Sequence, residues 1–354
     1  MPRTLLVRCC LLVALFNATV AAHAAEFANA AQPRLAATNE GRVYVAYGHG
    51  RDVFVARSDN GGENFAPSIK VANVPQLMLG MRRGPRLAAQ GEHVTVTLIA
   101  HDLLAFHSAD GGRTWSGPVT LNEVPTSARE GLHDLAAGPD GKLFVTWLDL
   151  RSGKMELWGA LSDDAGRTWG TNAPIYRSPD QAICECCQPT AMFNAAGHLA
   201  VMWRNSIAGA RDMWLAVRPA GATVFAPARK LGTGTWTLNA CPMDGGGLVP
   251  LGRGEFATVW QRAGEVFYCP ADGAEISLGK GKQPVAIFHQ GQPLLFWQQG
   301  PDLVSARLSG RTVPVTHAPG ARFAVLASLA NGGGTLLAYE QGPAKGASVV
   351  VERL

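Results

Sequence analysis

The chain has 354 residues, a formal net charge of +4 and 16% charged residues, whereas average proteins have about 25%. So weak a positive charge gives no support to nucleic acid or an anionic membrane surface as a partner. The 41 glycines and 22 prolines are typical of short strands joined by tight turns.

The first 24 residues have the three parts of a secretory signal. Arg3 and Arg8 come first, an apolar run from Cys9 to Phe16 follows, and small residues end at Ala24. The apolar run is shorter than the roughly 20 residues that a membrane span needs, and no later stretch is long and apolar enough to be one. We therefore expect cleavage near Ala24 and a periplasmic or secreted product without a membrane span. Loss of the two arginines would lower its net charge to about +2.

From Pro33 onward, one pattern of strands and turns repeats. The segments PRLAATNEGRVYVAYG, PRLAAQGEHVTVTLIA and HDLAAGPDGKLFVTWL begin at Pro33, Pro85 and His133. Each contains an apolar strand, a turn and an alternating strand, and further strands follow. Alternation with a period of two, bounded by Gly, Asp and Asn, indicates strands and hairpins. A repeat of roughly 40 to 55 residues with four strands is typical of a β-propeller blade.

Seven such units can be counted. Their first strands begin near Pro33, Pro85, His133, Pro189, Met243, Pro284 and Arg322. The last three units are short and irregular, so six blades is the alternative. The seventh unit ends after its third strand, and the segment AAEFANAAQ at residues 24–32 could supply the fourth and close the ring. The sequence predicts an all-β fold, a β-propeller of four-stranded blades, in one domain over residues 25–354.

Two Gly-rich turns fit the pattern S-x-D-x-G-x-T-W. They are SADGGRTW at residues 108–115 and SDDAGRTW at residues 162–169, and SDNGGENF at residues 58–65 is a degraded copy. The aspartate folds back on its own backbone to hold the turn, and glycine takes the positive φ. The final aromatic residue is expected to fill the gap between adjacent sheets. We interpret four residues as structural: Asp110, Trp115, Asp164 and Trp169.

These turns resemble the Asp boxes of the sialidase superfamily of β-propellers, and with the repeat pattern the resemblance covers nearly the whole mature chain. The segments CECCQPT at Cys184 and WTLNACPMDG at Trp236 resemble, more specifically, a group of exported bacterial proteins described as sialidase-like by fold. In the family, the boxes lie away from the mouth of the active site. Sialidase chemistry would require an arginine cluster, a tyrosine nucleophile with a glutamate partner, and an aspartate as acid and base. The chain lacks the family's Phe-Arg-Ile-Pro run and an obvious tyrosine–glutamate pair.

Three arginines, Arg34, Arg86 and Arg322, can be aligned at one position of the first strand, in QPRLAA, GPRLAA and ARFAVLA. Their units are neighbours in a closed ring, and innermost strands line the central channel. An arginine fork suits a carboxylate because it donates two parallel hydrogen bonds. The same position of the first strand holds Asp134 in the third unit and Asp244 in the fifth. We interpret these five residues as an anion-binding set, although their charges could instead neutralise one another in a solvated channel.

A cysteine cluster precedes the first strand of the fourth unit. Cys184, Cys186 and Cys187 stand there, and Cys241 precedes the first strand of the fifth unit, so all four sulfurs should enter one face side by side. Three interpretations stay open: a disulfide to Cys241, a thiolate site for copper or zinc, and redox-active thiols. Cys269 lies in a third strand and is expected to be a lone packed thiol.

The sequence thus favours an exported, monomeric propeller that binds a small anionic or carbohydrate ligand at the channel mouth. Thiolate binding of copper or zinc is the first alternative, and exo-α-sialidase-type hydrolysis is the second. Whether the protein is an enzyme is left open, because a fold does not determine a function.

Overall fold

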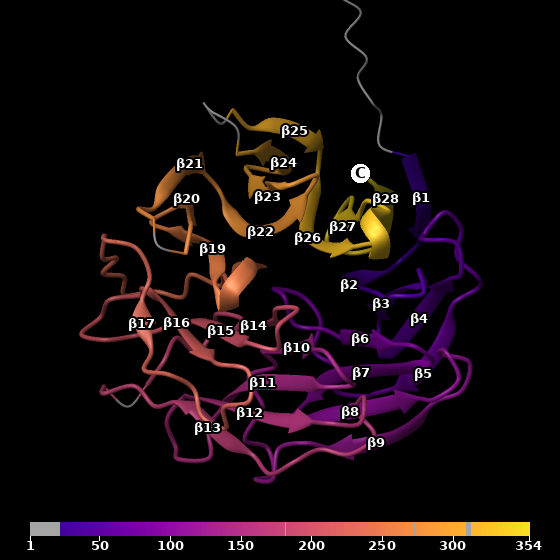
Figure 1. Ribbon diagram of the computed structural model, residues 1–354, viewed down its shortest axis with the longest axis horizontal. Helices are drawn as coiled ribbons and strands as arrows, with labels where there is room; N and C mark the ends of the chain where they lie inside the picture. Colours follow the sequence, from indigo (N-terminus) through magenta and orange to yellow (C-terminus); the bar gives the residue numbers. More distant parts are fainter. Residues whose placement is uncertain (1–21, 181, 272, 309–312) are drawn as a thin grey trace, which may run out of the picture.

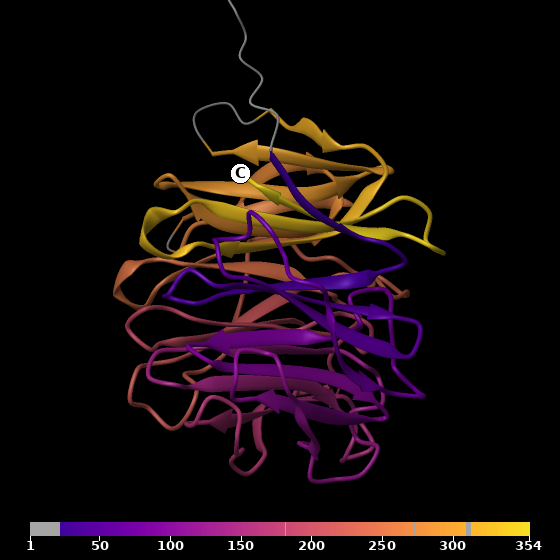
Figure 2. The same cartoon turned by 90° about the vertical axis from the view of Figure 1, so that its right-hand side faces the viewer.

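The computed structural model describes residues 22–180, 182–271, 273–308 and 313–354. Over these residues the chain forms seven antiparallel sheets of four strands each, arranged around a central axis in chain order (Figure 1). Figure 2 shows the same ring from the side. The predicted all-β propeller is confirmed, and the number of blades is seven rather than six.

The strands of each blade follow one another from the axis outward. Blade 1 contains β2 (Ala31–Ala37), β3 (Val43–His49), β4 (Asp52–Ser58) and β5 (Ile69–Asn73). Blade 2 contains β6 (Arg86–Gln90), β7 (His93–Ala100), β8 (Asp102–Ser108) and β9 (Ser116–Thr120). Blade 3 contains β10 (His133–Ala137), β11 (Leu143–Asp149), β12 (Glu156–Ser162) and β13 (Ala173–Tyr176). Blade 4 contains β14 (Thr190–Phe193), β15 (Leu199–Arg204), β16 (Met213–Arg218) and β17 (Arg229–Lys230).

The remaining blades follow the same order until the ring closes. Blade 5 contains β18 (Gly246–Pro250), β19 (Phe256–Arg262), β20 (Glu265–Cys269) and β21 (Ile276–Lys280). Blade 6 contains β22 (Lys282–His289), β23 (Gln292–Gln299), β24 (Asp302–Arg307) and β25 (Val315–Ala318). Blade 7 contains β26 (Ala321–Ser328), β27 (Thr335–Gln341), β28 (Ser348–Arg353) and β1 (Ala22–Phe27). Short 3-10 turns η1 (Gly252–Gly254) and η2 (Ala330–Gly332) precede β19 and β27.

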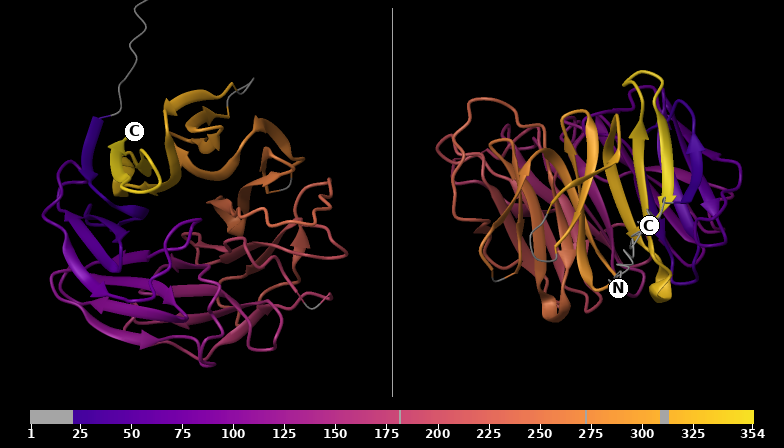
Figure 3. Two further views of the ribbon diagram at one scale, coloured as in Figure 1. Left: turned by 180° about the vertical axis from the view of Figure 1, so that it is seen from behind. Right: turned by 90° about the horizontal axis from the view of Figure 1, so that it is seen from above.

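The ring is closed by a strand from the opposite end of the sequence. Strand β1 pairs antiparallel with β28, with Ala25 opposite Val351 and Phe27 opposite Val349, as the segment AAEFANAAQ predicted. Figure 3 shows these two strands, indigo and yellow, side by side. Cleavage near Ala24 would leave residues 25–27 of β1 in place. The rest of the predicted signal, residues 1–21, lies outside the described residues. Among the described residues, no helix has the length and apolar character needed to cross a membrane.

Apolar side chains fill the space between each pair of neighbouring blades. The described residues form seven buried clusters, and each joins two adjacent sheets. The aromatic residues that recur near the ends of the second strands belong to this core. Trp147, Trp203, Trp260 and Trp297 are at most 1% exposed, and Tyr47 and Tyr339 are also buried. The wide indole rings fill gaps that open as the blades diverge from the axis.

The two complete Asp boxes lie between the third and fourth strands of blades 2 and 3. In the second box, Asp164 accepts hydrogen bonds from the Thr168 amide at 2.9 Å, the Thr168 hydroxyl at 2.7 Å and the Ser162 hydroxyl at 2.9 Å. Asp110 holds the first box in the same way. The rings of Trp115 and Trp169 pack against the clusters between blades 1 and 2 and between blades 2 and 3.

The second Asp box should make stability depend on acid pH. Partial burial raises the pKa of Asp164, but hydrogen bonds from Thr168 and Ser162 outweigh it and lower the pKa from 3.8 to about 2. Because the folded pKa is depressed, this stabilisation is present at neutral pH and is lost as the pH falls from about 4 towards 2. Urea unfolding at both pH values should show a smaller acid-dependent loss for Asp164→Asn than for the wild type. Asp163→Asn, whose exposed side chain takes no part in the turn, should behave as the wild type does. An unchanged loss in Asp164→Asn would contradict this prediction.

Candidate functional site

One end of the channel opens into a hollow of about 760 Å³, which we call the mouth hollow. Its walls come from the segments that enter the first strands of blades 1, 2, 5, 6 and 7 and from loops of blades 1, 6 and 7. The lining contains the cations Lys282, Arg322 and Lys345 and one carboxylate, Glu340. Apolar side chains, among them Leu79, Met81, Met243 and Phe323, form much of the remaining wall.

The charges of the mouth hollow do not cancel. Arg322 forms an ion pair with Glu340 at 2.9 Å and donates to the carbonyl of Gly342 at 2.6 Å. Glu340 also accepts hydrogen bonds from the backbone and side-chain amides of Gln32, at 2.8 and 3.0 Å. Lys282 and Lys345 are exposed, and neither forms an ion pair with a described residue. The hollow therefore carries an excess of positive charge and suits an anion.

A buried polar layer lies between the mouth hollow and the channel below it. Arg82, from the connection between β5 and β6, extends to blade 6 and donates to the side chain of Gln283 and, at 2.8 Å, to its carbonyl. The side-chain amide of Gln283 donates to the carbonyl of Met243 at 2.7 Å, and its backbone amide donates to Asp244 at 2.9 Å. Gln283 lines the hollow, whereas Arg82 lines the channel cavity.

Asp244 therefore acts within the protein framework rather than on the hollow surface. It is 2% exposed and accepts hydrogen bonds from the backbone of Gln283, which links blades 5 and 6. Burial raises its pKa, against the opposing effect of the Arg204 charge and the hydrogen bonds. Sequence reasoning placed Asp244 in the anion-binding set. It missed Arg82, which lies in a connection outside the repeat, and Gln283, because their contact joins distant segments.

Arg86 and Asp134 lie together beneath the polar layer. Arg86 is 1% exposed, and its Nε lies 3.3 Å from Asp134 and 3.0 Å from the carbonyl of His133. Its other nitrogens donate to backbone carbonyls, including that of Arg82 at 2.5 Å. Burial lowers the pKa of Arg86 to about 10, although Asp134 opposes the change. The donors of this side chain are therefore used within the protein.

Arg34 lines a cavity of about 150 Å³ in the channel, together with Arg82 and Asp134. Burial, with the charge of nearby Arg86, lowers the pKa of Arg34. No hydrogen bond or ion pair among the described residues joins Arg322 to Arg34 or Arg86, and Arg322 lines the mouth hollow instead. The structure thus divides the predicted anion-binding set between two depths along the channel axis. Arg322 lines the mouth hollow, whereas Arg34 and Asp134 line the channel cavity.

The reason for this division is a bulge in three first strands. In blades 1, 6 and 7 the strand registers shift around Gln32, Gln283 and Phe323, and each of these residues has a positive φ near 56°. Arg322 precedes its bulge, whereas Arg34 follows its own, so Arg322 corresponds to Ala31 rather than to Arg34. The predicted equivalence of these two arginines is therefore wrong.

The same comparison shows a residue that sequence reasoning missed. Lys282 precedes the bulge of blade 6, as Arg322 precedes that of blade 7, and both line the mouth hollow. Bulges commonly re-aim side chains in this way. Lys282 was overlooked because no glycine marks the bulge that places it there.

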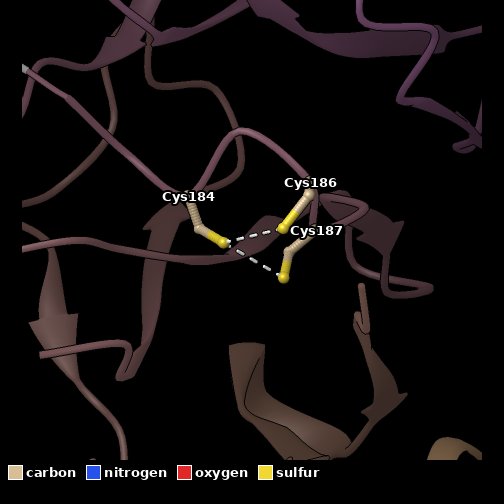
Figure 4. A group of neighbouring side chains, drawn as sticks. All are labelled: Cys184, Cys186 and Cys187. Carbon is tan, nitrogen blue, oxygen red and sulfur yellow. Dashed lines mark hydrogen bonds between the residues drawn. The ribbon is translucent and has the colours of Figure 1, made fainter. Parts of the chain in front are cut away.

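A second group of side chains gathers in the turn before β14. We call Cys184, Cys186 and Cys187 the cysteine trio (Figure 4). The Sγ of Cys184 lies 3.2 Å from that of Cys187 and 3.6 Å from that of Cys186, and all three sulfurs lie within 4.8 Å of one another. These distances exceed the S–S bond of about 2.05 Å, so the trio consists of free thiols here.

The other two described cysteines lie outside the trio. Cys241 is exposed, and the nearby thiol of Cys186 raises its pKa. The predicted neighbour is thus beside the trio, next to Pro242 and Met243 of the mouth hollow. Cys269 is buried in β20, and its thiol donates to the carbonyl of Gly273 at 3.4 Å.

Burial and hydrogen bonding divide the cysteine trio electrostatically. Cys184 and Cys187 are each 1% exposed, and Cys186 is half-buried. Hydrogen bonding with Cys186 and Cys187, together with the charge of Arg204, holds the pKa of Cys184 well below its usual range. Burial raises the pKa of Cys187. The arrangement can therefore share one negative charge among three sulfurs.

A tyrosine–glutamate pair exists, but it lies in the core. The hydroxyl of Tyr339 in β27 donates to Glu352 in β28 at 2.5 Å, and Glu352 also contacts His317 at 2.8 Å. Burial and Glu352 raise the pKa of Tyr339, which is the opposite of what a nucleophile needs. Sequence reasoning missed Glu352 because only the register of the two strands brings it near Tyr339.

No protein-family model matches the chain, and no curated protein matches its sequence. Solved structures do match it. Polysaccharide lyase Uly1 aligns with a TM-score of 0.56 and 10% identity, over 89% of this chain and 88% of that one. A protein of unknown function from Dyadobacter fermentans aligns with a TM-score of 0.54 and 13% identity, over 95% and 97%. The GH93 α-L-arabinofuranosidase of Fusarium graminearum, in complex with arabinobiose, aligns with a TM-score of 0.51 and 12% identity, over 92% and 93%. These matches support the β-propeller fold that the repeat pattern predicted.

Proposed function

We propose that the protein binds a small anionic ligand, of the acidic-sugar class, in the mouth hollow. The observation that carries this proposal is the charge of the lining: three cations stand against one carboxylate in a space of about 760 Å³. Ligand sites in proteins commonly measure about 300 to 1,000 Å³. A saccharide of a few rings would therefore fit, and its carboxylate would offset the excess charge.

Arg322, Lys282 and Lys345 would contribute to ligand binding in different ways. Arg322 is held by Glu340 and the carbonyl of Gly342, so its guanidinium is pre-oriented for a ligand carboxylate. Lys282 and Lys345 are exposed, so they contribute attraction at longer range and direct contacts to a ligand that enters from solvent. Apolar faces of sugar rings would pack on Met81, which is 39% exposed, and on Phe323.

The carbohydrate class also draws on the matching structures. One of them is a polysaccharide lyase, and another was solved with arabinobiose. Their likeness to this chain concerns the fold, so the anionic character of the ligand comes from Lys282, Arg322 and Lys345 alone. Sialidase-type hydrolysis is not part of the proposal, because no described tyrosine lines the mouth hollow.

Calorimetric titration with a digalacturonate, N-acetylneuraminate and neutral arabinobiose tests the proposal. We expect at least one acidic sugar to bind and arabinobiose to bind more weakly. Lys345→Glu should weaken binding of the acidic sugar about 10-fold, since reversing a charge at an exposed contact changes the free energy by about 1 to 2 kcal/mol.

Lys154→Glu is the matched control, because Lys154 is an exposed lysine outside the hollow and its replacement changes the net charge equally. Equal weakening in the two variants would show that net charge, rather than the mouth hollow, governs binding. Failure of both acidic sugars to bind would remove the proposal.

A further inference from the structure

The ligand binding proposed for the mouth hollow does not involve the cysteine trio. We infer that Cys184, Cys186 and Cys187 bind one Cu(I) ion through three thiolate sulfurs, at a site separate from the anionic ligand. The three sulfurs lie close together in one turn, and a buried arginine, Arg204, carries a positive charge near them.

The geometry of the trio is close to that of a trigonal site. An ion about 2.3 Å from each of three sulfurs, the usual metal–thiolate distance, holds those sulfurs about 4 Å apart. Two of the present separations, 3.2 Å and 3.6 Å, are somewhat shorter than that value, and the third is at most 4.8 Å. Rotation about the Cα–Cβ bonds could reach it without moving the backbone.

The backbone of the turn is fixed on one side. The Cys184 amide donates to the carbonyl of Arg204 at 3.0 Å, and a β-bridge joins Ile183 to Asn205 at the end of β15. Three sulfurs from four consecutive positions therefore converge from an anchored segment. Pre-orientation of this kind lowers the entropic cost of binding an ion.

The donor set favours Cu(I) over Zn(II). No histidine or carboxylate among the described residues belongs to the group whose ligand atoms lie within 4.8 Å of one another. All-sulfur sites select soft ions. Structural zinc sites are almost always tetrahedral and would need a fourth ligand. Cys241, which could be that ligand, is exposed and stands outside the group.

Arg204 supplies the charge that a buried thiolate site needs. Its side chain is 1% exposed, it donates to the carbonyls of Arg211 and Gln261, and its Nε has no hydrogen-bond partner among the described residues. Its charge acts on buried Asp244, but no described carboxylate forms an ion pair with it. A buried cation requires compensation, and three thiolates with one Cu(I) would carry a net charge of about −2 beside it. Binding would release the thiol protons to solvent.

The test is an anaerobic titration of the reduced protein with Cu(I) in competition with bicinchoninate. We expect one Cu(I) per chain in the wild type. Cys187→Ser and Cys186→Ser should each weaken binding more than the roughly 10- to 100-fold that loss of an outer-shell partner costs. Cys241→Ser and Cys269→Ser should bind as the wild type does. Thermal unfolding of each variant shows that it is folded, and the half-buried Cys186 keeps the test usable should replacement of Cys187 disrupt folding.

Three outcomes would overturn the inference. The first is Cu(I) binding that is unchanged in both trio variants. The second is a site that prefers Zn(II) and depends on Cys241. The third is a disulfide within the trio, detected by intact mass in the protein as isolated without reductant. Acidic-sugar binding should be the same in Cys186→Ser and the wild type, so failure here and failure of the mouth-hollow proposal are distinguishable.

Discussion

A chain that begins at Ala28 should be less stable than one that begins at Ala25 by about 3 kcal/mol, measured by urea unfolding. Both chains lack the predicted signal, but only the shorter one lacks the part of β1 that pairs with Val349 and Val351. Phe27 packs on Tyr47 and Phe65, with ring centroids 5.1 and 5.9 Å apart. Loss of one aromatic side chain from an apolar contact costs roughly 2 to 3 kcal/mol, and lost strand hydrogen bonds add about 1 kcal/mol.

The shorter chain should also associate with itself. Without β1, strand β28 becomes an exposed edge that carries Val349, Val350 and Val351, and uncovered edges of this kind pair with other chains. Light scattering should show association only in the shorter chain. Phe27→Ala in the longer chain separates the two effects, because it removes the ring and keeps the strand. Equal stability of the two truncated chains would contradict the role given to β1.

Trp147→Ala should lower the free energy of unfolding by about 3 to 5 kcal/mol, the usual cost of replacing a buried tryptophan with alanine. Trp147 is 0% exposed and lies in the cluster between blades 2 and 3. Its Nε1 donates to Asp149 at 2.7 Å, and Asp149 is itself buried. The substitution therefore creates a cavity and removes a donor from a buried carboxylate. Urea unfolding followed by tryptophan fluorescence would measure the loss.

Trp203 offers a matched control at the corresponding position of the next blade. It is 1% exposed, but its Nε1 has no hydrogen-bond partner among the described residues. Replacement by phenylalanine removes a bonded donor at Trp147 and an unbonded one at Trp203. Trp147→Phe should therefore cost about 1 to 3 kcal/mol more than Trp203→Phe. Equal costs would show that the bond to Asp149 contributes nothing.

The architecture could be predicted from the sequence because its signals are local. Alternation with a period of two and Gly-rich turns recur along the chain, and they located the strands of seven blades. The closing strand followed from the same pattern, since the seventh unit lacked an outer strand and an apolar segment was available near the N-terminus. The aromatic residues near the ends of the second strands recur for the same reason, because that position of the repeat faces the neighbouring sheet.

The candidate site could be predicted only in part. The bulges at Gln32, Gln283 and Phe323 shift the register of three first strands, and none of these residues is the glycine that usually marks a positive φ. Repeat alignment therefore equated Arg322 with Arg34 and overlooked Lys282. Alignment also has no access to contacts between distant segments, such as those of Arg82 with Gln283 across the axis.

The cysteines show the same limit at shorter range. The repeat placed the segments of Cys184 and Cys241 on neighbouring blades, and the structure brings Cys241 beside Cys186. The separation of a buried trio from an exposed fourth thiol depends on how the turn before β14 folds, which the spacing C-x-C-C does not determine.

The most direct test of the account is a crystal structure of the protein with the acidic sugar that binds best in solution. The account predicts that the ligand occupies the mouth hollow and that its carboxylate lies within hydrogen-bond distance of Arg322, Lys282 or Lys345. A ligand bound at another face of the propeller, or held in the hollow with its carboxylate turned away from all three cations, would contradict it.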